Sequence, residues 1–119
     1  MSSVDRLKIY LQKLETRLHE AGAKHIRLNQ QRIKRENMSF SGGNGRIWIQ
    51  PVSGSYDVSL SGKSLTAELQ PQLESLFGAV CKGHKQPNER TGKLEQPYWR
   101  TENLSLVEKV VHLYSKTRK

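Results

Sequence analysis

Apolar residues near the start of the chain recur at every third or fourth position, whereas farther along they alternate with a period of two. The first spacing places one apolar stripe on a helix over residues 4–21. The stripe consists of Leu7, Leu11, Leu14, Leu18 and Ala21. The alternation at 56–60 is typical of a strand with one wet face, and helical spacing returns over 65–80 and 107–114. Because both kinds of stripe have to be buried together, the pattern predicts an α+β domain.

Two turns of small residues divide the middle of the chain into strands. The run Ser-Gly-Gly-Asn-Gly at 41–45 tolerates positive φ, and a second turn follows at 53–55. We expect strands over 24–36 and 45–50, a third after the second turn, and a short one at 97–101. The predicted order is α-β-β-β-α-loop-β-α, with a three- to four-stranded antiparallel sheet and helices packed on one face.

The size of the chain and its single cysteine limit the class of protein. We expect one domain over residues 1–119, which is long enough to bury its own core. With Cys81 alone no intramolecular disulfide can form, so a reducing cytoplasm is the expected location. No apolar run is long enough for a signal peptide or a membrane span, so we expect no membrane partner.

The charge of the chain bears on its partners. Twenty Lys and Arg residues against eleven Asp and Glu residues give a formal net charge of +9. A net charge of this size says little about the fold, but it favours a polyanionic partner. The expected partner is DNA or RNA, or a nucleoprotein complex.

Positive charge gathers in two segments, 24–46 and the loop at 82–97, with a basic tail at 116–119. Guanidinium groups bind phosphate oxygens bidentately, and each neutralised phosphate releases counterions. The predicted phosphate contacts are Arg27, Arg32, Lys34, Arg35, Arg46, Lys85, Arg90, Lys93 and Arg100. The alternative is that these side chains form an ordinary wet face of the sheet, where Lys and Arg discourage edge pairing.

Three aromatic residues are candidates for contact with bases. Neighbouring residues on a strand face opposite sides of the sheet, so Tyr98 and Trp99 cannot both be buried in the core. We expect Trp99 inward and Tyr98 available as a stacking platform for a base. Trp48, between Ile47 and Ile49, is either core or contact surface.

Motifs for catalysis or metal binding are weak. Cys81 and His84 have a C-x-x-H spacing, but zinc needs four ligands and no second close pair follows. The carboxylates follow no pattern for Mg²⁺. The glycine run at 41–45 lacks the lysine of a phosphate loop and precedes a strand. We therefore predict no catalytic residues, no metal and no cofactor.

The leading hypothesis is a small basic nucleic-acid-binding protein, non-catalytic, with largely sequence-independent phosphate contacts. No recognised base-reading motif is present, so weak sequence preference and strong salt dependence are expected. The alternative is a protein-interaction factor, an adaptor or an inhibitor of phage or mobile-element type, that docks on a nucleic-acid-handling machine. A monomer and a homodimer through the first-helix stripe are both compatible with either hypothesis.

Overall fold

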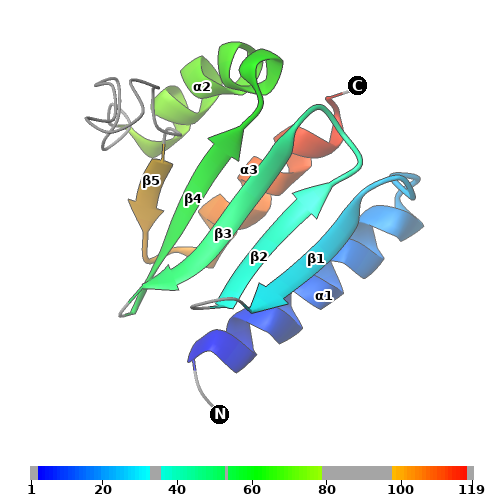
Figure 1. Cartoon of the computed structure of the whole chain (residues 1–119), viewed down its shortest axis with the longest axis vertical. Helices are drawn as coiled ribbons and strands as arrows, with labels where there is room; N and C mark the ends of the chain where they lie inside the picture. Colours follow the sequence, from blue (N-terminus) through cyan, green and yellow to red (C-terminus); the bar gives the residue numbers. More distant parts are fainter. Residues whose placement is uncertain (1–2, 33–35, 53, 79–97, 118–119) are drawn as a thin grey trace.

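A computed structural model of the chain describes residues 3–32, 36–52, 54–78 and 98–117 (Figure 1). Its elements in chain order are α1 (Ser3–Glu20), β1 (Arg27–Arg32), β2 (Glu36–Ser41), β3 (Arg46–Val52), β4 (Ser55–Ser61), α2 (Lys63–Phe77), β5 (Tyr98–Thr101) and α3 (Leu104–Ser115). Within these ranges, no helix combines the length and the apolar character needed to cross a bilayer.

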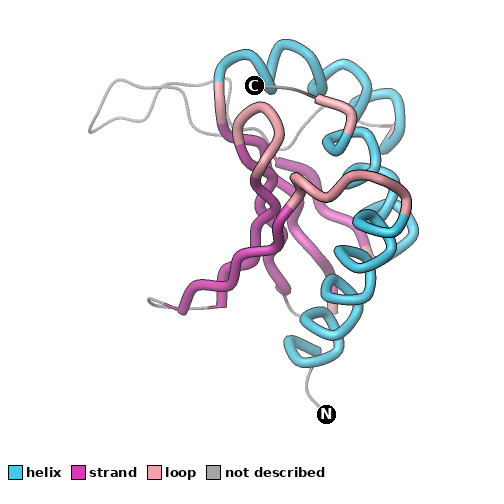
Figure 2. The backbone as a smooth tube through the Cα atoms, turned by 90° about the vertical axis from the view of Figure 1, so that its right-hand side faces the viewer, coloured by secondary structure: helices cyan, strands magenta, loops and turns pink. Residues whose placement is uncertain are grey.

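The five strands form one antiparallel sheet in the order β1-β2-β3-β4-β5. All three helices lie on the same side of this sheet, and its other side carries no helix of the described chain (Figure 2). The predicted α+β class and the antiparallel sheet with helices on one face are confirmed. Among the described residues, the single layer of helices leaves the other face of the sheet open, and the candidate site lies on this open face.

The number of strands differs from the prediction, which gave three to four. The segment expected as one strand over 24–36 ends at Arg32, and β2 then pairs back on β1 with Leu28 opposite Phe40. Residues 27–41 contain neither Gly nor Pro. Nothing in the composition therefore marked the point where the chain reverses.

The core lies between the sheet and the helices. Cross-strand partners share one face of a sheet, and two apolar rows run across the helix-facing side. These rows are Leu28, Phe40, Ile47 and Leu60, and Met38, Ile49, Val58 and Trp99. The predicted inward position of Trp99 is confirmed, since it is 2% exposed and stacks on Phe77 of α2 with ring centroids 5.9 Å apart.

The apolar stripe of α1 packs into this core. Its four leucines are at most 2% exposed: Leu7, Leu11, Leu14 and Leu18. A homodimer seam formed by the same leucines would require α1 to leave the sheet. Each buried leucine contributes about 2 kcal/mol, so the stripe stabilises this domain.

The boundaries of α2 and α3 differ from the sequence-based expectation. Pro71 disfavours a helix interior, and from the sequence alone this would put the start of the helix near Gln70, yet α2 begins at Lys63. Buried leucines on both sides of Pro71 hold α2 against the core and outweigh the cost of about 3 kcal/mol. The spacing of Ser105 and Glu108 in the sequence predicts a capping box, but this is wrong, because Asn103 caps α3 and accepts from the Ser105 N–H at 2.9 Å.

The glycine turn at 41–45 is fixed to the end of α3. Tyr114 Oη accepts from the Gly43 N–H at 3.1 Å and donates to the Gly45 carbonyl at 2.8 Å. Thr117 Oγ1 accepts from the Asn44 N–H at 3.1 Å. The Gly43 and Asn44 amides are therefore used within the domain, which agrees with a hairpin turn and not with a phosphate-binding loop.

Replacing Tyr114 with Phe should lower the free energy of unfolding by about 2 kcal/mol, since the buried Gly43 amide loses its acceptor. Burial raises the pKa of Tyr114 above 10.0. An unfolded tyrosine loses its proton first as pH rises past 10, so this contribution is complete below pH 10 and lost above it. Urea midpoints at pH 8 and pH 11 should fall less with pH in Y114F than in the wild type. Equal falls in the two proteins would contradict the assignment.

Candidate nucleic-acid interface

The open face of the sheet presents polar and aromatic side chains in rows that cross the strands. One row runs through Asn29, Ser39, Trp48, Ser59 and Tyr98. In a second row Arg27 is opposite Ser41, and Arg46 is opposite Ser61. The larger side chains come from β1, β3 and β5, and the serines come from β2 and β4. Each large side chain is therefore separated from the next by a short one.

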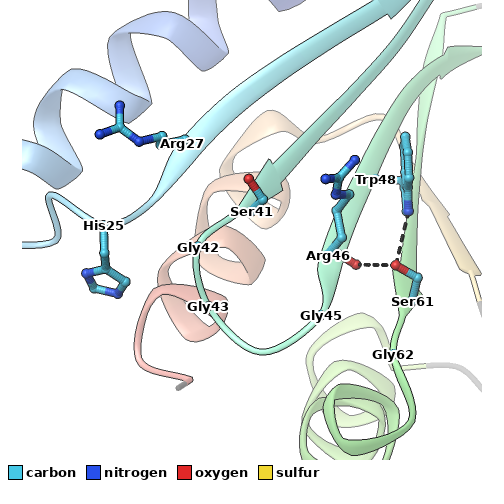
Figure 3. Close-up of a pocket in the computed structure, with 10 residues that line it drawn as sticks. All are labelled: His25, Arg27, Ser41, Gly42, Gly43, Gly45, Arg46, Trp48, Ser61 and Gly62. Carbon is cyan, nitrogen blue, oxygen red and sulfur yellow. Dashed lines mark hydrogen bonds between the residues drawn. The ribbon is translucent and has the colours of Figure 1, made fainter. Parts of the chain in front are cut away.

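A hollow of about 840 Å³ opens at the end of the sheet where β1 and β3 begin (Figure 3). It is lined by His25, Arg27, Ser41, Gly42, Gly43, Gly45, Arg46, Trp48, Ser61 and Gly62. Two of these ten residues are arginines, one is a histidine and none carries a carboxylate. Arg27 and Arg46 line the hollow from β1 and β3, and in Figure 3 the Arg27 guanidinium extends away from Arg46, whose side chain lies beside Trp48.

Trp48 is held at the edge of this hollow by its neighbours. Its Nε1–H donates to Ser61 Oγ at 3.2 Å, and that hydroxyl donates to the Arg46 carbonyl at 3.1 Å. The Arg46 guanidinium lies over the indole, 5.4 Å from the ring centroid, in a cation–π contact. Trp48 is half-buried and lies outside the hydrophobic core. The structure thus places Trp48 on the open face and not in the core, and a contact with a ligand stays a prediction.

The backbone of the turn packs closely around the hollow. Gly42 has φ of +105°, and a Cβ there would lie 1.9 Å from the His25 carbonyl oxygen. Gly45 has φ of +68°, and a Cβ there would lie 2.2 Å from the Ser61 carbonyl oxygen. Side chains are thus excluded at both positions, and the turn can approach β1 and β4 only with glycine at each.

Three of the predicted site residues lie on the open face near the hollow. Arg27 is exposed and Arg46 is half-buried, and both line it. Tyr98 is half-buried in the same cross-strand row as Trp48. Arg32 lies at the opposite end of β1 from Arg27, in register with Glu36. The first two are therefore brought together, and Arg32 is not.

Arg100 has a carboxylate partner. Its Nε and Nη2 donate to the two oxygens of Asp57 at 2.7 and 3.1 Å, in a bidentate pair across β4 and β5. These hydrogen bonds raise the pKa of Arg100. Asp57 offsets its charge, so Arg100 adds less to the positive field than Arg27 and Arg46 do. A nucleic-acid contact by Arg100 stays a prediction.

Several predicted residues fall outside the described part of the chain. They are Lys34, Arg35, Lys85, Arg90 and Lys93, together with Cys81 and the rest of the 82–97 loop, which includes His84. Their contacts with nucleic acid stay predictions.

Comparison of the chain with protein-family models, curated proteins and solved structures gave no match.

The chemistry offered by the hollow is positive charge beside an aromatic ring. In the described ranges, no three His, Cys, Asp or Glu side chains come close enough to hold a metal ion. The hollow can bind an anion through guanidinium groups and can present a flat ring to a planar ligand.

Sequence reasoning missed two contributors to the hollow. His25 lies next to the Gly42 backbone, and Ser61 orients Trp48. No local pattern marks either residue, because their roles depend on the return of β2 beside β1 and of β4 beside β3. For Trp48 a signal existed: Ile47 and Ile49 point inward, so the residue between them has to point outward.

Proposed function

We propose that this chain is a small non-catalytic nucleic-acid-binding protein that contacts phosphates through the open face of its sheet, with little dependence on sequence. The observation that carries the proposal is the hollow lined by Arg27 and Arg46, in which no lining residue is acidic. The formal net charge of +9 supports it, because long-range attraction would bring a polyanion to the surface.

The placement of the two arginines suits a phosphate backbone. One strand, β2, separates β1 from β3, so their Cα atoms are about 10 Å apart at two strand spacings. Guanidinium groups that extend from strands at that separation can each contact a different phosphate of the same backbone. Each can make paired hydrogen bonds to phosphate oxygens, which are stronger than bonds between neutral groups.

The test is a titration of fluorescently labelled single- and double-stranded oligonucleotides at increasing salt, followed by fluorescence anisotropy. We expect micromolar or tighter binding at low salt. The logarithm of the affinity should fall linearly with the logarithm of salt concentration, with a slope of about −1.5 or steeper for two or more phosphate contacts.

Flat titration curves at the lowest salt would contradict the proposal. Retention of an acidic partner protein in a pull-down, together with flat curves, would favour the alternative of a protein-interaction factor. Polyglutamate serves as a matched polyanion in the same assay. Equal binding of polyglutamate and oligonucleotide would show that the surface recognises charge alone.

A further inference from the structure

We infer that the open face takes a single strand of nucleic acid in preference to a duplex, with a base stacked on the Trp48 indole. This inference rests on the proposed function, because it names the class of nucleic acid bound at the same face. The carrying observation is that Trp48 lines the hollow together with both arginines. The hollow therefore combines an aromatic ring that can stack on a base with two cations that can bind phosphate.

The Trp48 ring is fixed before any ligand arrives. Its nitrogen is bonded to Ser61, and one face of the ring lies under the Arg46 guanidinium. A base that stacks on the opposite face would complete a sandwich of guanidinium, indole and base. Because the indole is already held in one orientation, little side-chain freedom is lost on binding.

The cross-strand neighbours of Trp48 are short side chains. Its cross-strand partners are Ser39 on one side and Ser59 on the other. Ser39 is only 2% exposed, as expected for a short side chain between larger ones. Tyr98 follows one strand beyond Ser59, about 10 Å from Trp48 at two strand spacings.

A duplex cannot use such a ring in the same way. Paired bases are stacked on one another and present only their edges to a protein, whereas unpaired bases expose a flat face to aromatic side chains. Arg46 is two residues from Trp48 on the same strand and both side chains line the hollow. A base on Trp48 therefore places its own backbone phosphate next to the arginines.

The experiment compares Trp48→Leu with Trp48→Phe. Labelled single strands of DNA and of RNA, about 15 nucleotides long, and a DNA duplex of the same length are titrated at low salt. We expect the wild type to bind one or both single strands about tenfold more tightly than the duplex. W48L should lose about tenfold in single-strand affinity, with duplex binding unchanged, and W48F should retain most of it.

Intrinsic fluorescence gives a second measurement. A base on Trp48 should quench its emission, whereas Trp99 is 2% exposed and stacked on Phe77, so its emission should not change. W48F retains Trp99 alone and should show no quenching on binding. Circular dichroism of both variants establishes that they are folded before titration.

Each outcome decides between the two proposals. Equal affinity for duplex and single strand, or unchanged single-strand binding by W48L, would overturn this inference and leave the proposed function in place. Absence of binding to every oligonucleotide by the wild type would overturn both. Tight binding of a single strand by the wild type, weakened in W48L and largely retained in W48F, supports both the proposed function and this inference.

Discussion

Gly42→Ala should lower the free energy of unfolding by about 4 kcal/mol, the largest loss we expect for a single added methyl group among the glycines described. Two costs combine at this position. With φ of +105° the backbone is strained for any L side chain, at about 1 to 3 kcal/mol. The new Cβ would also lie 1.9 Å from the His25 carbonyl oxygen, so β1 and the turn would have to separate.

Gly22→Ala is the matched control for this prediction. Its φ is +103°, nearly the same as that of Gly42, but a Cβ there meets nothing within 4 Å. The backbone cost alone remains, about 2 kcal/mol. Chemical denaturation followed by circular dichroism measures both variants. Equal losses would show that the close contact between the turn and the His25 carbonyl does not restrict position 42.

The sequence predicted those parts of the fold that depend only on the spacing of residues close together in the chain. The leucine stripe of α1 gave a helix with one buried face, and the alternation around Tyr98 and Trp99 gave the face of each ring. The reversal between β1 and β2 could not be predicted in this way. Its strands are held together by pairing and by the burial of Met38 and Phe40, not by turn-forming residues in the chain.

The candidate site was harder to predict than the fold, because it depends more on contacts between segments that are distant in the sequence. Arg27 and Arg46 were both predicted as phosphate contacts, yet their gathering at one hollow follows from the five-strand register, which was not expected. The same register pairs Arg100 with Asp57. From the sequence alone, Arg27 and Arg46, which line a hollow without carboxylates, could not be distinguished from Arg100, whose charge is offset by Asp57.

Replacing Arg27 and Arg46 together with Ala should weaken oligonucleotide binding about 100-fold at low salt, if each charged contact is worth about 1.5 kcal/mol. The slope of log affinity against log salt should become shallower by about 1.5, since two phosphate contacts are lost. The fold should survive. Arg27 is exposed, and the hydrogen bond of Arg46 to Ser61 uses its backbone carbonyl.

A second double variant, Arg6→Ala with Lys109→Ala, separates site from net charge. Both residues are exposed on the helical layer, on α1 and α3. Their removal lowers the net charge by the same two units, so long-range attraction falls equally in both variants. Only loss of Arg27 and Arg46 should make the salt slope shallower by about 1.5. If both variants weaken binding to the same degree, charge is acting over the whole surface, and the hollow is not where the phosphates bind.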